Sequence, residues 1–288
     1  MMGRIISVSA APYDGYPVAD MLDSLAACGA THVEPAYIVG YTEPFDESAF
    51  SDDHARRYAG WLNASGVACH AFSSHINLGG TDAVAVFRGR MDFACRIGAE
   101  VINTNAAVCV NEAAFFRNIE SLIRHAETLG MVIGLENPGD GRASLFNVAA
   151  DGLELVERIG SSNVRLNYDP ANTASHRPEV DAIADAISAL PACGHLHLKA
   201  VRHTQEGWHF LSVGDGDLDD ARLLDGLRPF SDLAISIEMP LRMRRGEDAQ
   251  PWRRVAAVDR DRIESSVRAS LAFVRRELSR RGRPAEAV

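Results

Sequence analysis

An alternation of short apolar runs with longer amphipathic windows, repeated eight times, constrains the fold more than any other feature of the sequence. Each run has roughly four to six residues rich in Val, Ile or Leu, which is typical of a parallel strand buried on both faces. The eight predicted strands are Arg4–Ser9, His32–Pro35, Val67–Phe72, Glu100–Asn105, Met131–Glu136, Val164–Asp169, His195–Lys199 and Ala234–Glu238. Between them, apolar residues recur at helical spacing, most clearly over 21–28, 116–126, 180–190 and 261–281.

Eight βα units without a linker predict an α/β fold, a single (β/α)8 TIM barrel that spans residues 1–288 as one domain. The 288 residues suffice, because such a barrel usually needs roughly 250. The alternative is an open doubly wound sheet, but the first predicted turn, SAAPYDGYP, lacks the Gly-rich motif usual for that fold. The polar segment Met243–Pro251 follows the eighth strand and is predicted to be a loop over the barrel mouth.

The composition limits the partners and the cellular setting. The net charge of −10 repels phosphate backbones, so nucleic acid is not an expected partner. The five cysteines are isolated from one another, which argues against a structural zinc site or a disulfide framework and for a reducing compartment. No run approaches the ~20 apolar residues needed to cross a membrane, and the opening MMGRIISVSA fits a strand better than a signal peptide. We therefore expect a cytoplasmic protein without a membrane partner.

The carboxyl ends of four consecutive predicted strands are unusually polar, and in a barrel these ends face the active site. They carry Glu136, Asp169, His197 and Glu238. Any one of these acids alone is most often a helix cap or an ion-pair partner, so the joint pattern carries the prediction. Crowded carboxylates repel one another, and a divalent cation removes that repulsion. One nitrogen and three oxygen donors suit one Mn²⁺ ion, with Mg²⁺, Co²⁺ and Zn²⁺ as alternatives.

His195 and His197 lie on the same face of the seventh strand, because side chains alternate with a period of two. His197 is nearer the mouth and is the preferred ligand. His195 is predicted to be a packed, hydrogen-bonded histidine.

The chain resembles the xylose isomerase-like barrel superfamily, particularly its sugar isomerase and epimerase branch, which includes ketose 3-epimerases. The resemblance covers essentially the whole chain, and its most specific parts are GLENPGD, NYDPAN, GHLHLKA, SVGDGDLD and ISIE. It implies the same four metal ligands, with Glu136 and Glu238 as the catalytic acid and base. It also implies a small carbohydrate substrate and a homodimer or homotetramer. The expected activity is isomerisation or epimerisation of a sugar, sugar acid or keto-polyol by proton transfer through a metal-stabilised enediolate.

The chain departs from the ketose 3-epimerase pattern at the substrate end of the site. Asn172 stands where those epimerases have His, and His203 stands where they have Arg. Either Lys199, Arg202 and His203 hold a carboxylate or another polar group, or the last two lie in a solvated loop. The full set of predicted substrate-binding residues is Glu34, His70, Asn172, Lys199, Arg202 and His203.

Three other functions stay open at this point. The nearest is a metal-dependent lyase of the same fold, resembling inosose dehydratases, because it also begins by removing a proton beside a carbonyl. The run HINLGG resembles endonuclease IV, but Asn105 and Asn172 stand where that DNA repair enzyme has metal-binding histidines. A non-catalytic binding protein is disfavoured by the complete set of four ligands.

Overall fold

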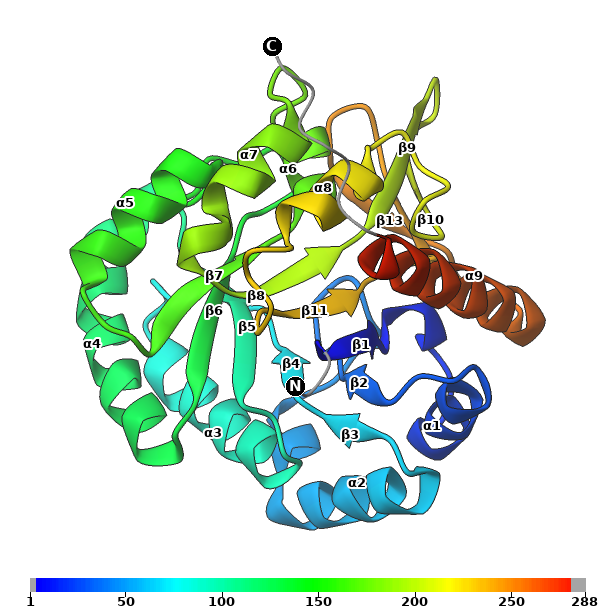
Figure 1. Ribbon diagram of the computed structural model, residues 1–288. Helices are drawn as coiled ribbons and strands as arrows, with labels where there is room; N and C mark the ends of the chain where they lie inside the picture. Colours follow the sequence, from blue (N-terminus) through cyan, green and yellow to red (C-terminus); the bar gives the residue numbers. More distant parts are fainter. Residues whose placement is uncertain (1–3, 281–288) are drawn as a thin grey trace.

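The computed structural model describes residues 4–280, and its centre is a sheet of parallel strands that curls into a barrel (Figure 1). Hydrogen bonds join the strands in the order β3-β2-β1-β11-β8-β7-β6-β5-β4. Their bounds are β1 Ile6–Ser9, β2 His32–Glu34, β3 Ala68–Cys69, β4 Ala71–Ser73, β5 Val101–Asn105, β6 Val132–Glu136, β7 Val164–Tyr168, β8 Cys193–Leu198 and β11 Ala234–Ile237. The eight predicted strands correspond to these segments, and the predicted (β/α)8 barrel is confirmed.

The third predicted strand is broken at His70 into β3 and β4. The first piece pairs with β2, where Cys69 lies opposite Val33, and the second pairs with β5, where Phe72 lies opposite Ile102. The two ends of the strand order are therefore consecutive pieces of one strand, which closes the barrel.

Helices surround the barrel, mostly one after each strand (Figure 1). The α-helices are α1 Val18–Ala27, α2 Asp52–Ser65, α3 Ala83–Arg96, α4 Glu112–Leu129, α5 Ala149–Ile159, α6 Pro170–His176, α7 Ala182–Ala189, α8 Asp220–Gly226 and α9 Arg260–Ser279. Short 3-10 turns occupy Ala11–Tyr13, Glu47–Phe50, Cys109–Asn111 and Leu190–Ala192. The helical windows of the sequence correspond to α1, α4, α7 and α9, and residue 281 lies outside the described residues.

Local sequence signals fix several helix ends. The carboxylates of Asp181 and Asp259 accept hydrogen bonds from the first backbone N–H groups of α7 and α9. Gly66 and Gly130 follow α2 and α4 with φ values of 70° and 64°, a conformation that side chains other than glycine rarely adopt. None of the helices described combines the length and the apolar character needed to cross a membrane.

A second, antiparallel sheet lies beside the carboxyl ends of the barrel strands, in the order β13-β12-β10-β9. It consists of β9 Ala200–Thr204, β10 Gly207–Leu211, β12 Met243–Arg245 and β13 Pro251–Arg253. The prediction of a loop over Met243–Pro251 is therefore wrong at both ends of that segment. Strands β12 and β13 are three residues long, too short for a clear alternation. β13 pairs with β12, and β12 pairs with β10, which lies far away in the sequence.

The main core lies between the barrel and its helices and is built from aliphatic and aromatic side chains. Phe72, Phe87, Phe93, Phe115 and Phe146 are among its largest fully buried members. Interiors of this kind are close-packed, so the strand ends are held in fixed relative positions.

Candidate active site

Four side chains predicted to converge do so at the carboxyl ends of four neighbouring strands. Glu136 ends β6, Asp169 follows β7, His197 is the penultimate residue of β8, and Glu238 follows β11. All four are buried, and one oxygen or nitrogen from each lies within 4.8 Å of those of the other three. They adjoin a cavity of about 340 Å³, here called the mouth cavity, which Glu136 and Glu238 line directly.

Asp169 is held firmly by the start of α6. Its Oδ1 accepts hydrogen bonds from the backbone N–H groups of Ala171 (2.9 Å) and Asn172 (3.1 Å) as the N-cap of that helix. Its own N–H donates to the side chain of Asn137 at 2.8 Å. The second oxygen, Oδ2, remains for Lys199, whose Nζ lies 2.8 Å away.

Burial and neighbouring charges shift the pKa values of two of the acids in opposite directions. Burial raises the pKa of Asp169; the Lys199 ammonium opposes this shift, and the Glu136 and Glu238 carboxylates reinforce it. Burial also opposes ionisation of Glu136, but His197 and its neighbours hold the pKa of that carboxyl well below its usual range. Three crowded carboxylates and one imidazole are a donor set that a divalent cation fits.

His197 is oriented from below by Glu34. Its Nε2 lies 3.1 Å from Glu34 Oε1, while Nδ1 faces Glu136 Oε2 at 3.3 Å. Glu34 is fully buried and also accepts hydrogen bonds from Ser73 (2.6 Å) and Asn103 (2.9 Å). The prediction that Glu34 faces the mouth and binds substrate is therefore corrected: its side chain points into the barrel interior, beneath the cluster.

His195 lies deeper in the same interior and is a packed histidine, as predicted. Its ring nitrogens lie 3.0 Å from Asn167 Oδ1 and 3.1 Å from Ser236 Oγ. Burial lowers the pKa of His195 to about 4, so the ring is neutral around pH 7.

Two of the other predicted substrate-binding residues, Asn172 and Lys199, line the mouth cavity. Asn172 donates to Glu136 Oε1 at 2.9 Å. Lys199 Nζ lies 2.6 Å from Glu238 Oε2, so this ammonium bridges two acids of the cluster.

The remaining predicted substrate-binding residues lie away from the mouth cavity, and their predicted location is corrected. His70 sits at the break between β3 and β4, 3.8 Å from Glu100, which precedes β5 and therefore marks the opposite end of the strands. Arg202 and His203 are exposed on β9, because that strand carries the chain away from the barrel after Lys199.

The structure adds two residues that sequence reasoning did not single out. His75 follows β4 and lines the mouth cavity; its buried Nε2 lies 3.3 Å from Glu136 Oε2 without forming a hydrogen bond. Its place just after the third strand was a usable signal. Arg245 lines the same cavity from β12. No signal pointed to it, because its segment was predicted to be a polar loop.

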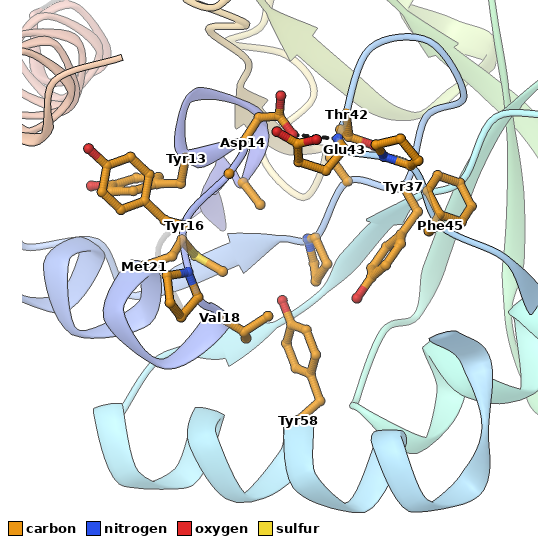
Figure 2. A pocket seen from close by; sticks show the side chains of 16 residues that line it. Tyr13, Asp14, Tyr16, Val18, Met21, Tyr37, Thr42, Glu43, Phe45 and Tyr58 are labelled. Atoms are coloured by element: carbon orange, nitrogen blue, oxygen red, sulfur yellow. Dashed lines mark hydrogen bonds between the residues drawn. The ribbon is translucent and has the colours of Figure 1, made fainter. Parts of the chain in front are cut away.

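A separate cavity of about 420 Å³ lies between the turn after β1, the segment after β2, and α2 (Figure 2). Its walls are mainly apolar. The carboxylates at its rim are already paired: Asp14 and Glu43 both contact Arg242, at 2.8 and 2.6 Å. The cluster suited to chemistry is therefore the one at the barrel mouth.

Comparison with known proteins identifies the family of this barrel. Residues 22–262 match the profile of the xylose isomerase-like TIM barrel family, which is most of the chain. The chain belongs to this family. The strand ends that carry Glu136, Asp169, His197 and Glu238 all fall within the matched region.

Individual relatives are more distant. A D-psicose 3-epimerase of Enterocloster bolteae is 26% identical over 170 residues, which cover 57% of this chain and 53% of that protein. The chain thus spans about half the length of the curated relatives it matches. A D-psicose 3-epimerase of Clostridium cellulolyticum, solved with D-tagatose, has a TM-score of 0.74 at 16% identity, covering 96% of this chain and 99% of that one. A probable 3-DHS dehydratase of Bacillus anthracis has a TM-score of 0.67 at 13% identity, covering 91% and 97%.

Proposed function

We propose that this barrel is a divalent-metal-dependent isomerase or epimerase that acts on a small carbohydrate: a sugar, a sugar acid or a keto-polyol. The observation that carries the proposal is the buried cluster of Glu136, Asp169, His197 and Glu238 beside a cavity of about 340 Å³. A cavity of this size matches a small-molecule ligand. The likeness to a D-psicose 3-epimerase supports the same reaction class.

The four clustered residues would hold the cation, with Mn²⁺ as the preferred metal. Bound there, it would withdraw electron density from a substrate carbonyl and so acidify the neighbouring C–H group. Asp169 is a suitable ligand because the start of α6 fixes its carboxylate. His197 is suitable because Glu34 fixes its ring from the other side.

Glu136 and Glu238 would move the proton. Glu136 is in the form that can accept a proton, because nearby imidazoles lower its pKa and keep the carboxylate ionised. One glutamate removes the proton beside the carbonyl, and the other returns a proton to the substrate. Return to the opposite face gives an epimer, and return to the neighbouring carbon gives an isomer. Positioned groups of this kind contribute about 10²–10⁴-fold to the rate.

A dehydratase is the second candidate, and the similar fold of the probable 3-DHS dehydratase favours it. Both reactions begin with the same proton removal, so the cluster serves either one. Mass spectrometry of the product separates them: an isomer keeps the mass of the substrate, and a dehydration product loses one water.

The experiment that tests the proposal compares the wild type with Glu238→Gln and His197→Ala. Each protein is loaded with Mn²⁺, Mg²⁺, Co²⁺ or Zn²⁺, and its metal content and melting temperature are measured. We expect about one equivalent of metal and a raised melting temperature in the wild type, because a ligand that binds only the folded state stabilises it. Both variants should bind the metal more weakly.

His203→Ala is the matched control, because this histidine is exposed and outside the mouth cavity. It should bind metal like the wild type.

The activity test uses the metal-loaded wild type. During turnover, deuterium from the solvent should enter ketoses, keto-inositols or sugar acids. Wild-type protein that binds none of the four metals, and that melts like both variants, would contradict the proposal.

A further inference from the structure

Arg245 is a buried cation without an anionic partner. The residue is 2% exposed, and its guanidinium donates to Asn172 Oδ1 and Ser175 Oγ, both at 2.7 Å, with Tyr41 Oη at 3.4 Å. All three acceptors are neutral. Within residues 4–280, no carboxylate comes within ion-pair distance of this guanidinium. A charge taken out of water in this way is unfavourable unless a counter-charge accompanies it.

The other buried arginines show the usual arrangement. Arg90 and Arg242 are 3% and 4% exposed, which matches Arg245. Arg90 is paired with Glu47, and Arg242 is paired with Asp14 at 2.8 Å. Among these three, Arg245 alone lacks a carboxylate, and it alone lines the mouth cavity.

The surroundings make room for the guanidinium at this place. A Cβ atom on Gly139 would overlap the guanidinium of Arg245, so the guanidinium occupies its present place only because residue 139 has no side chain. Asn172 Oδ1 accepts from Arg245 and also lies 3.2 Å from Lys199 Nζ. Both cations lie 5.3 Å from the centre of the Phe210 ring. The cavity therefore has one wall that is built around two cations.

The carboxylates of the cluster make their direct contacts with other groups than Arg245. Glu136, Asp169 and Glu238 together balance one divalent cation and the Lys199 ammonium, which already contacts Asp169 and Glu238. Burial opposes the charge of Arg245, and Asp169 and Glu238 raise its pKa only from beyond ion-pair distance, since both contact Lys199 directly. We infer that the substrate brings the missing charge: an oxyanion group, either a carboxylate or a phosphate, that binds the guanidinium of Arg245 in the mouth cavity. This inference rests on the proposed function, because it names the substrate class of the same site.

In this inference, Arg245 takes the place of the anion-binding residues predicted from the sequence. Lys199 is engaged by two acids, and Arg202 and His203 lie outside the mouth cavity. A guanidinium also suits the task, because its parallel N–H groups match the two oxygens of a carboxylate or phosphate.

The test measures binding of three non-reacting probes to the Mn²⁺-loaded protein by calorimetry: D-glucitol, D-gluconate and D-glucitol 6-phosphate. They share a six-carbon chain and differ in charge, so they separate a carboxylate from a phosphate. We expect at least one anionic probe to bind about 10- to 100-fold more tightly than D-glucitol, which is the usual range for hydrogen bonds to a charged group.

Arg245→Gln should remove that preference while leaving the dissociation constant of D-glucitol within about twofold. Gly139→Ala should weaken it as well, because the guanidinium is displaced with its charge intact; this variant keeps the test valid if Arg245→Gln folds poorly. Arg202→Gln is the matched control and should retain the wild-type preference. An equal preference in the wild type and Arg245→Gln, or no preference in the wild type, would overturn the inference.

Metal content measured on the same samples keeps the two proposals apart. Wild-type protein that holds about one equivalent of metal but does not distinguish the probes overturns the anion assignment and leaves the metalloenzyme. Protein that never holds metal overturns the proposed function. The Arg245 assignment is then decided with the metal-free protein: it stands if an anionic probe binds more tightly than D-glucitol and Arg245→Gln removes that preference, and it fails otherwise.

Discussion

At the residue scale, buried carboxylates in this barrel differ in whether the fold supplies a partner for their charge. Glu34 is fully buried, yet imidazole, hydroxyl and amide donors surround it, and His197 and His195 offset the desolvation so that its pKa is lowered. Asp220, at the start of α8, is the opposite case. Its Oδ2 accepts one hydrogen bond from Gly214 N–H at 2.8 Å, and its Oδ1 has no hydrogen-bond partner in the described part of the chain.

Burial raises the pKa of Asp220 from 3.8 to about 6. The folded protein therefore holds this proton more tightly than the unfolded chain does, and the stability decreases as the pH rises through that interval. Above it, the charged carboxylate costs on the order of 1–3 kcal/mol. We expect Asp220→Asn to raise the melting temperature at pH 8 and to lose this advantage near pH 4. A gain of the same size at both pH values would contradict this explanation.

At the element scale, the packing of the barrel interior limits the size of the side chains that strand β6 can carry. Gly134 faces the centre, where a Cβ atom would overlap Asn103 Oδ1 and press on Asn167. We expect Gly134→Ala to lower the free energy of unfolding by about 1–3 kcal/mol, the usual range for an overpacked interior, as measured by denaturant titration.

Gly89 in α3 is the matched control, because a Cβ atom there has no neighbour within 4 Å. Gly89→Ala should be neutral or stabilising by up to about 1 kcal/mol, since alanine favours the helix. Similar losses in both variants would show that the interior contact is not the cause.

The strands and helices of the barrel could be predicted because each carries its own periodic pattern. β5, β6 and β8 fall within about two residues of the predicted runs, and all four candidate metal ligands lie on such strand ends. β12 and β13 could not be predicted in this way. They are short; β13 pairs with β12, and β12 pairs with the distant β10, where Trp208 lies opposite Arg245.

The lack of a local signal also explains which site residues could not be placed from the sequence. Alternation along a strand shows that Glu34 is near the mouth, but not whether its carboxylate points above or below His197. Arg202 and His203 were expected beside the substrate, but the second sheet sets the direction of the chain after Lys199 and carries both residues away from the cavity. Arg245 enters the cavity through that sheet and through the space left at Gly139. These are tertiary facts without a local signal.

At the scale of the whole molecule, an ion-pair cluster joins segments near the two ends of the chain. Arg242, which follows β11, binds Asp14 in the turn after β1 at 2.8 Å, and Arg253 binds the same carboxylate oxygen at 2.9 Å. Glu43 completes the cluster at the rim of the cavity in Figure 2, where its backbone N–H donates to Asp14.

We expect Arg242→Gln to lower the free energy of unfolding by about 3–5 kcal/mol, because it leaves the buried Asp14 carboxylate poorly compensated. Glu43→Gln should have little effect, since half of that side chain is exposed. Calorimetric melting of the three proteins checks this. A small loss in Arg242→Gln would show that Arg253 alone compensates Asp14.

The second sheet has a consequence for how this protein could diversify. The candidate metal ligands lie at the ends of barrel strands, and the barrel closes only if each of these strands pairs with its neighbours. Arg245 sits on a short hairpin added after the last of those strands. Insertions, deletions or exchange of that hairpin would leave the barrel pairing intact but alter the Arg245 side of the cationic wall and the ion pair of Arg253 with Asp14. Under the two proposals made above, the metal ligands and the anion-binding arginine are encoded in separable stretches of the gene, so a new specificity can arise by replacing one short segment.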